Sequence, residues 1–291
     1  MGVDEGSATG RTEATFTGVA GGRIHWRVWN APDPRAQVVI VHGYGEHGDR
    51  YNRFARRLNA EGMSVWANDH RGHGRSEGPR GVVMDLGDAV ADVDRVVDMA
   101  RGARPGLPVF MFAHSMGGTI GLRYALDHQE KLAGLVLSSA AVSLEGLGVS
   151  RLQRGAAGLV GRIAPKLAIN KLPLEGISRD PEEDRIYQED PLVHKGAQPA
   201  RTVSELLNAM SELPGDIAGL RIPLLVIAGS ADPIVPAAGS RDIAERAGSA
   251  DKRIIVYEGF VHELINEPPE DRERVTRDII DWLRARTDAE N

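Results

Sequence analysis

The segment Leu107-Pro-Val-Phe-Met-Phe-Ala-His-Ser-Met-Gly-Gly-Thr-Ile120 changes from an apolar run to a helical pattern at Ser115. Residues 109–112 predict a buried strand, and the residues after Ser115 predict a helix. A strand-to-helix turn of this kind is tight, so the residues two before and two after the serine have to be small. They are Ala113 and Gly117. Ala113 departs from the strict G-x-S-x-G pattern by one methyl group, which the turn tolerates. The segment therefore predicts a strand, a sharp turn that exposes Ser115, and a helix.

The rest of the chain repeats this alternation of strand and helix. Further apolar runs that predict buried strands lie at residues 37–41, 132–137 and 223–228, with weaker patterns at 64–67 and 253–257. Apolar stripes at helical spacing lie between them and are formed by Val90, Val93, Val96 and Val97, and by Val275, Ile279, Ile280 and Leu283. Strands that alternate with helices predict an α/β fold with a mainly parallel central sheet flanked by helices. Functional residues of such sheets lie at the C-terminal ends of strands.

The alternation stops between about Ser143 and Gly219, where Gly, Pro and charged residues interrupt short amphipathic pieces. The clearest of these pieces are residues 152–163 and 203–210. Strand patterns resume at Pro223, so the stretch interrupts one α/β domain and does not follow it. We therefore expect a first part of the core at 1–142, an inserted helical cap or lid at 143–219, and a second part of the core at 220–291.

Serine is a weak nucleophile, so catalysis by Ser115 requires a general base and an acid that orients the base. In strand–serine–helix hydrolases the acid precedes the histidine in the chain. His262 follows the strand pattern at 253–257, and it is the only one of the nine histidines beyond residue 194. Asp232 lies just past the end of the strand at 223–228. The alternatives are a surface histidine and an aspartate that only caps a turn. The order and the placement favour a catalytic triad of Ser115, Asp232 and His262.

The tetrahedral intermediate of acyl transfer requires two preorganised N–H donors, which form an oxyanion hole. Met116, the residue after the serine, is expected to supply one. Tyr44 is expected to supply the other, because His42-Gly43 closes the strand at 37–41 and lets the backbone turn toward the serine.

Composition narrows the class of protein further. The chain has 291 residues, is 42% hydrophobic and carries a net charge of −6, so it can bury a large core and has no electrostatic reason to bind nucleic acid. The absence of cysteine excludes disulfides, thiolate metal sites and a cysteine nucleophile. The polar start of the chain lacks the features of a signal peptide, and no apolar run approaches the ~18 residues of a membrane span. We therefore expect a cytoplasmic protein.

Two histidines are candidates for metal ligands. His70 and His73 lie beside Asp69, but a third cluster of ligands is missing from the sequence, so a glycine-rich connection is the favoured interpretation. The chemistry of the proposed triad requires neither a metal nor another cofactor.

With these motifs, the chain resembles the monoacylglycerol lipases of the α/β-hydrolase superfamily from about Gly18 to Arg284. The segments that carry the resemblance are HGYGEHGDRY (residues 42–51), DHRGHGRSEG (69–78), HSMGG (114–118), YQEDPL (187–192), GSAD (229–232) and YEGFVH (257–262). The resemblance implies the α/β-hydrolase fold, hydrolysis of a fatty acyl ester of glycerol, an apolar cap that forms an acyl tunnel, and peripheral contact with a membrane.

The resemblance also implies roles on the alcohol side of the substrate. It places Glu46, Arg50 and Tyr187 around a polar glycerol pocket. An alternative for Glu46 and Arg50 is that they brace the loop that carries Tyr44. Ile265 stands where some relatives carry a polar residue, which favours a more apolar pocket in this chain.

The sequence therefore predicts a serine carboxylic-ester hydrolase that cleaves monoacylglycerols to a fatty acid and glycerol through an acyl-enzyme. Alternatives within the class are a lysophospholipase, a general carboxylesterase and a hydrolase of bulky aromatic monoesters. From another class, a non-catalytic module that binds small molecules has the same fold. Dehalogenases and epoxide hydrolases are excluded, because they need an aspartate where Ser115 stands.

Overall fold

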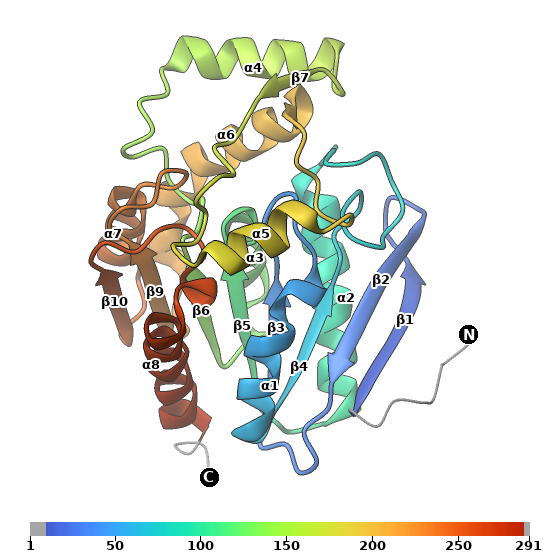
Figure 1. Cartoon of the computed structure of the whole chain (residues 1–291), viewed down its shortest axis with the longest axis vertical. Helices are drawn as coiled ribbons and strands as arrows, with labels where there is room; N and C mark the ends of the chain where they lie inside the picture. Colours follow the sequence, from blue (N-terminus) through green and yellow to red (C-terminus); the bar gives the residue numbers. More distant parts are fainter. Residues whose placement is uncertain (1–9, 288–291) are drawn as a thin grey trace.

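An eight-stranded sheet runs through the middle of the computed structural model, which describes residues 10–287 (Figure 1). The strand order is β1-β2-β4-β3-β5-β6-β9-β10, and only β1 and β2 run antiparallel to their neighbours. The strands are β1 (Arg11–Thr17), β2 (Arg23–Trp29), β3 (Ala36–Val41), β4 (Met63–Asn68), β5 (Val109–His114), β6 (Gly134–Ser138), β9 (Leu224–Gly229) and β10 (Lys252–Tyr257). The prediction of a mainly parallel sheet is confirmed. Most of the N-terminal segment considered for a signal peptide lies outside the described residues.

The central strands lie where the apolar runs predict them, with ends that differ by one or two residues. β3, β5, β6 and β9 are buried along their whole length, because helices cover both faces of the sheet. The sequence pattern did not predict β1 and β2. β1 forms the edge of the sheet and its side chains are half-buried or exposed, so it contains no continuous apolar run.

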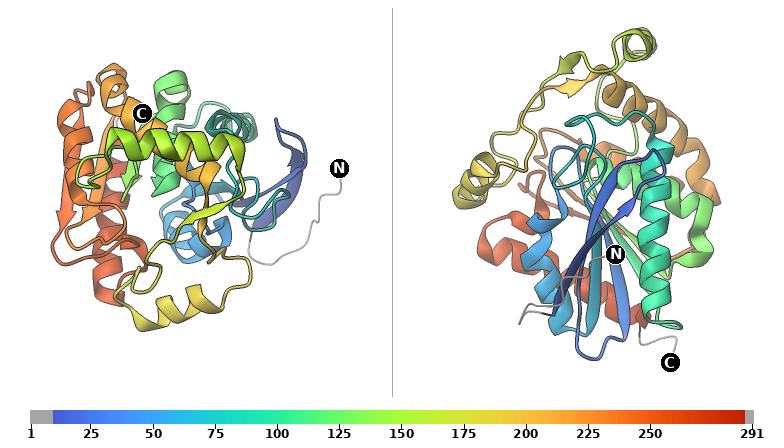
Figure 2. Two further views of the ribbon diagram at one scale, coloured as in Figure 1. Left: turned by 90° about the horizontal axis from the view of Figure 1, so that it is seen from above. Right: turned by 90° about the vertical axis from the view of Figure 1, so that its right-hand side faces the viewer.

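Helices pack on both faces of the sheet (Figure 2). One face is covered by α1 (Asn52–Ala60) and α8 (Pro269–Thr287), and the other by α2 (Leu86–Ala103), α3 (Met116–His128) and α7 (Ala237–Arg246). Four short 3-10 helices occur within the described residues: η1 (Gly48–Tyr51), η2 (Gln129–Lys131), η3 (Ile217–Gly219) and η4 (Leu264–Asn266). The two apolar stripes of the sequence form the buried faces of α2 and α8, as expected.

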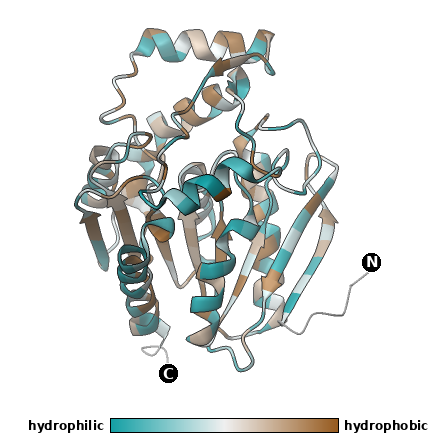
Figure 3. Ribbon diagram, in the orientation of Figure 1, coloured by the Kyte–Doolittle hydropathy of each residue, from teal (hydrophilic) through white to brown (hydrophobic). Residues whose placement is uncertain are grey.

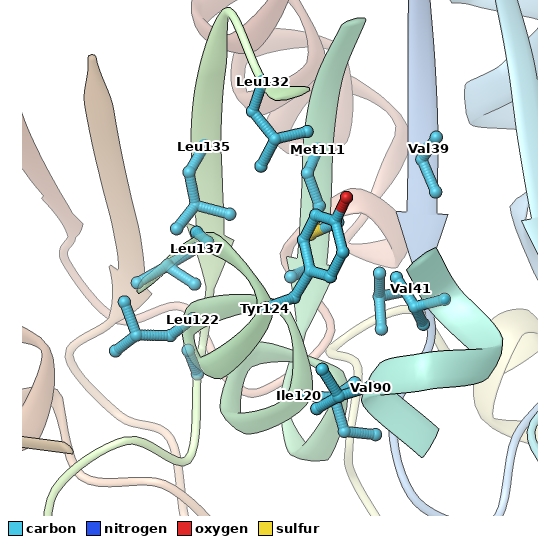
Figure 4. Close-up of a cluster of buried hydrophobic side chains, with 14 of the residues drawn as sticks. Val39, Val41, Val90, Met111, Ile120, Leu122, Tyr124, Leu132, Leu135 and Leu137 are labelled. Carbon is cyan, nitrogen blue, oxygen red and sulfur yellow. The ribbon is translucent and has the colours of Figure 1, made fainter. Parts of the chain in front are cut away.

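The apolar core between α3 and the sheet fixes the end of β5, which Ser115 directly follows. Met111 of β5 and Leu135 of β6 pack with Ile120 and Tyr124 of α3 (Figure 4). Each of these side chains is essentially inaccessible to solvent, and such burial stabilises the fold by roughly 1.5–3 kcal/mol per side chain. The turn between β5 and α3 is therefore held from both sides.

The segment between the neighbouring strands β6 and β9 extends over the C-terminal ends of the strands (Figure 1). It contains α4 (Arg151–Ile163), β7 (Ala168–Asn170), α5 (Pro181–Glu189), β8 (Gln198–Pro199) and α6 (Ala200–Asp216). The helix predicted at 203–210 is thus longer, and α5 was not predicted. The exact division into core and cap stays a prediction.

The inserted segment has one half that contains α5 and one half in which α4 packs on α6, and the two are attached differently to the sheet domain. The half that contains α5 forms the ion pairs Arg53–Glu183 and Arg272–Asp180 with the core, and a hydrogen bond joins His47 to Asp190. α4 packs mainly on α6 and exposes large apolar side chains, and polar and apolar residues alternate along it (Figure 3). None of the helices within residues 10–287 combines the length and the apolar character that a bilayer span requires.

Candidate active site

Ser115 occupies a strained turn between β5 and α3. Its backbone has φ 53° and ψ −121°, and a positive φ is unfavourable for a residue with a side chain. A Cβ on Gly117 would lie 2.1 Å from the carbonyl oxygen of Val41, so only glycine fits two residues after the serine. The methyl of Ala113 faces Gly121, where an added Cβ would lie 2.6 Å from it. A glycine in α3 therefore makes room for the departure from the strict motif.

The structure brings Asp232 and His262 to Ser115. His262 Nε2 lies 3.0 Å from Ser115 Oγ, and His262 Nδ1 lies 2.7 Å from Asp232 Oδ2. Asp232 follows β9 and His262 follows β10, so all three side chains lie at the C-terminal ends of strands. The other oxygen of Asp232 accepts hydrogen bonds from the backbone N–H groups of Ile234 and Val235. Asp232 therefore both caps a turn and contacts the imidazole.

The electrostatics of the three residues favour one tautomer of His262. Burial alone would raise the pKa of Asp232, but His262 and the two backbone N–H groups lower it, so the carboxylate is ionised and only accepts hydrogen bonds. Nδ1 of His262 therefore carries the proton, and Nε2 accepts the hydrogen bond from the Ser115 hydroxyl. Burial alone would lower the pKa of His262, but the charge and the hydrogen bond of Asp232, together with the charges of Glu263 and Glu46, raise it.

The backbone around Ser115 provides candidate oxyanion donors. Met116 is the first residue of α3, and the first N–H groups of a helix have no partner within the helix. Tyr44 lies in the loop after β3. This loop passes close to the serine, since a Cβ on the neighbouring Gly43 would lie 3.0 Å from Ser115 Cβ. Glu46 Oε1 accepts a hydrogen bond from Gly43 N at 2.6 Å and holds this loop. The roles of Tyr44 and Met116 stay predictions.

A small pocket that contains two carboxylates, which we call the polar pocket, adjoins Ser115. Its volume is about 20 Å³, room for about one water molecule. Its polar lining includes Glu46, Tyr187 and Glu263, and the apolar side chains of Leu172, Leu174, Ile177 and Ile234 complete the wall. Arg50 does not line the pocket. The Arg50 guanidinium lies 4.5 Å from the ring centroid of Tyr187 and pairs with both carboxylates.

Of the residues expected in a glycerol pocket, Glu46 and Tyr187 line this small pocket and Arg50 lies next to them. Ile265 packs in the core beneath α8 and does not line the pocket, so it does not set the character of the pocket. The expectation of a more apolar pocket stays a prediction, and the apolar side chains in the lining are those of Leu172, Leu174, Ile177 and Ile234. Glu263 was missed by sequence reasoning, although its position directly after His262 was an available signal.

A second, apolar pocket also reaches Ser115 and is called the apolar channel. Its volume is about 290 Å³, and its lining includes Ser115, Met116 and Tyr44. Its wall consists mainly of apolar side chains from the inserted segment, namely Leu147, Val149, Leu172, Val203, Leu206, Leu207 and Met210. Ser115 therefore lines both the polar pocket and the apolar channel.

The residues considered for a metal have structural contacts. Asp69 is fully buried and accepts hydrogen bonds from both Nη atoms of Arg27, at 2.6 and 2.9 Å, and from the backbone N–H groups of Gly48 and Arg75. Burial lowers the pKa of His70 to about 4 and that of His73 to about 3, so both are neutral. Within residues 10–287, no group of three or more His, Cys, Asp or Glu side chains is arranged to hold a metal.

The sheet, the two helical layers and the Ser–His–Asp arrangement define a serine hydrolase of the α/β-hydrolase fold. Residues 32–269 match the family model described as serine aminopeptidase, S33. The monoacylglycerol lipase of Mycolicibacterium smegmatis is 40% identical over 94% of this chain and 97% of its own length. Human monoglyceride lipase is 37% identical over 87% of this chain and 84% of its own length.

Solved structures agree with the sequence comparison. The crystal structure of Paleococcus ferrophilus monoacylglycerol lipase superposes with a TM-score of 0.81 at 32% identity, covering 90% of this chain and 99% of that one. The chain belongs to the monoacylglycerol lipase family, and it is a carboxylic-ester hydrolase. The resemblance predicted from the sequence motifs is confirmed.

Proposed function

We propose that this protein hydrolyses monoacylglycerols to a fatty acid and glycerol, with Ser115 as nucleophile, His262 as general base and Asp232 as the group that orients the base. The observation that carries this proposal is the position of Ser115 Oγ. It lies 3.0 Å from His262 Nε2, at the boundary between a polar pocket and an apolar channel. A monoacylglycerol has the same division, since its scissile ester separates a diol from an acyl chain.

In the first step, Ser115 attacks the ester carbonyl while His262 Nε2 takes the hydroxyl proton. The backbone N–H groups of Tyr44 and Met116 stabilise the oxyanion that forms. His262 then donates the proton to the leaving glycerol oxygen, and an acyl-enzyme on Ser115 remains. In the second step, His262 takes a proton from water, and the water oxygen attacks the acyl carbon. The bond from this carbon to Ser115 Oγ then breaks, His262 returns the proton to Oγ, and the fatty acid leaves.

The polar pocket has to widen for a glycerol group to enter. Its volume of about 20 Å³ is close to that of one water molecule, whereas glycerol has six heavy atoms. Leu172 and Leu174 of the inserted segment form part of its wall, and they lie outside regular helices and strands. We infer that movement of this stretch admits the substrate.

A panel of esters tests the proposal. It contains monoacylglycerols of several chain lengths, di- and triacylglycerols, a lysophospholipid, an aromatic monoester and short nitrophenyl esters. The expected result is the highest kcat/KM on a monoacylglycerol. Faster turnover of the lysophospholipid or the aromatic ester would replace the proposal by one of those activities. Turnover of the short nitrophenyl esters that equals that of the monoacylglycerols would indicate a general carboxylesterase.

We also infer peripheral contact of α4 with a membrane. Leu152, Leu159 and Ile163 on α4 are 83%, 60% and 75% exposed. Residues 146–174 contain five Lys or Arg residues and no Asp or Glu, although the chain as a whole carries a net charge of −6. Apolar side chains beside cations favour the surface of an anionic bilayer.

Vesicle sedimentation tests this contact. Replacing Leu152, Leu159 and Ile163 by serine is expected to abolish binding to vesicles that contain anionic phosphatidylglycerol. Val19→Ser removes another exposed apolar side chain, 54% exposed, from the turn between β1 and β2 and serves as the control. Equal binding of the triple variant and the control would contradict the contact.

A further inference from the structure

Glu263 is a buried carboxylate at the alcohol side of the site. It follows His262 directly, is 5% exposed and lines the polar pocket together with Glu46. Its backbone N–H donates a hydrogen bond to the carbonyl of Ile177 in the inserted segment at 2.8 Å. The position of Glu263 is therefore fixed by the backbone of the inserted segment as well as by the His262 loop.

One cation balances the two carboxylates only in part. Arg50 contacts Glu263 through both Nη atoms, one of them at 2.7 Å, and Glu46 through Nη1 at 3.2 Å. Two negative groups and one positive group leave a net charge of −1. Arg50 lies behind the carboxylates, and among the described residues that line the pocket there is no Lys or Arg.

Glu263 is charged at neutral pH. Burial alone would raise the pKa of Glu263, but Arg50 and Asn266 lower it to about 2. A second negative charge brought to about 6 Å from the net charge of −1 on Arg50, Glu46 and Glu263 is disfavoured by roughly a hundredfold in affinity at an effective dielectric constant of about 20.

We propose that Glu263, together with Glu46, selects the leaving alcohol by charge, so that neutral and cationic alcohols are accepted and anionic ones are rejected. This inference rests on the proposed function, because it concerns the alcohol half of the same ester. The hydroxyls of glycerol donate hydrogen bonds to the carboxylates, and a cationic amino alcohol is attracted by them. A phosphate group meets two carboxylates and no Lys or Arg among the described residues that line the pocket.

The test compares octanoyl esters of glycerol, choline, glycerol 3-phosphate and methanol below their aggregation concentrations. We expect kcat/KM for the phosphate ester to be at least about a hundredfold below that for the glycerol ester. The choline ester has a bulky alcohol like the phosphate ester but is positively charged. Its kcat/KM is expected to stay within about tenfold of that for the glycerol ester. Equal rates on the phosphate and glycerol esters would overturn the inference, as would a choline ester as poor as the phosphate ester.

Variants assign the effect to Glu263. Glu263→Gln is expected to raise the ratio of phosphate-ester to glycerol-ester kcat/KM about tenfold and to lower the choline-to-glycerol ratio. Glu258→Gln removes an exposed carboxylate four residues before His262 and is expected to leave both ratios unchanged. Unchanged ratios in a folded Glu263→Gln protein would contradict the role of this residue.

The wild-type ranking tests charge selection even if Glu263→Gln does not fold. An enzyme inactive on the glycerol, choline and methyl esters alike would overturn the proposed function, and with it this inference. Activity on the glycerol and methyl esters with no discrimination by charge would overturn the inference alone.

Discussion

His262 Nδ1 lies 2.7 Å from the carboxylate of Asp232, and this contact opposes the effect of burial on the pKa of the imidazole. Burial disfavours the charged form of histidine, whereas a neighbouring carboxylate favours it. The carboxylates of Asp232, Glu263 and Glu46 together outweigh burial, so the pKa of His262 is raised above its ordinary value of 6.5.

The raised pKa predicts the pH dependence of the reaction. Only neutral His262 accepts the proton of Ser115, so kcat/KM is expected to fall as the pH drops through a pKa above 6.5. Glu263→Gln removes one of the carboxylates that raise this pKa, so the acidic limb of its profile is expected to lie at lower pH. A rate that stays constant down to pH 5 in protein shown to be folded would argue against a histidine base.

The apolar channel predicts selection of the acyl chain. Leu206→Trp narrows the channel and is expected to lower kcat/KM for a decanoyl ester by about a hundredfold, because three or four methylenes each lose about 0.8 kcal/mol of burial. Hydrolysis of the butyryl ester is expected to stay within about twofold. Leu152→Trp, at an exposed position of α4, is the matched control. Equal losses on both esters would show that the acyl chain does not occupy the channel.

Glu46 and Tyr187 are expected to act differently, although the resemblance assigns both to the glycerol pocket. Glu46 Oε1 already accepts hydrogen bonds from Gly43 N at 2.6 Å and from Tyr51 OH at 2.8 Å. Glu46→Gln is therefore expected to lower kcat/KM for the methyl ester as well as for the glycerol ester of the same acid, because it loosens the loop that carries Tyr44 in addition to removing a carboxylate from the pocket. Tyr187→Phe is expected to lose about tenfold mainly on the glycerol ester. Parallel losses in Tyr187→Phe would remove this residue from the glycerol pocket.

The triad could be predicted from the sequence because each member follows a strand pattern. Ser115, Asp232 and His262 stand at the ends of β5, β9 and β10, and parallel strands bring such ends to one edge of the sheet. The chain order of the three residues then leaves few other assignments. Contacts between residues that are far apart in the sequence and do not follow a strand pattern could not be predicted in this way.

Arg50 and Glu263 illustrate this limit. They are 213 positions apart, and nothing in either local sequence indicates that they form a buried ion pair. The same holds for Arg27 and Asp69, since Asp69 stands beside two histidines and Arg27 lies in a strand that the sequence pattern did not predict. Pairings of this kind follow from the assembled sheet and not from local pattern.

The ion pair of Asp69 with Arg27 predicts a stability effect. Both side chains are fully buried, and Asp69→Asn leaves the guanidinium with Asp49, 3.1 Å from Arg27 Nε, as a carboxylate in contact with it. The free energy of unfolding at pH 7 is therefore expected to fall by about 3 kcal/mol, the lower end of the range for a broken buried pair. Urea unfolding measures it, with Asp33→Asn at an exposed position as the control.

The pH dependence of unfolding gives a second readout for this pair. Burial alone would raise the pKa of Asp69, but Arg27 holds it well below its usual range. A depressed folded-state pKa stabilises the protein above the unfolded-state pKa of about 4, and this contribution is lost as the pH falls below it. A change below 1 kcal/mol in Asp69→Asn would show that the pair is dispensable.

The most direct test of the central claim is labelling with a fluorophosphonate, followed by mass spectrometry of the modified peptide. The proposed mechanism predicts a single modified residue, Ser115, and no labelling of Ser115→Ala. It also predicts that Ser115→Ala, His262→Ala and Asp232→Asn each lose roughly 10⁴-fold or more in kcat, and that the losses do not add because the three residues act as one unit. Labelling of another residue, or near-native turnover by folded Ser115→Ala, would contradict the assignment of Ser115 as the nucleophile.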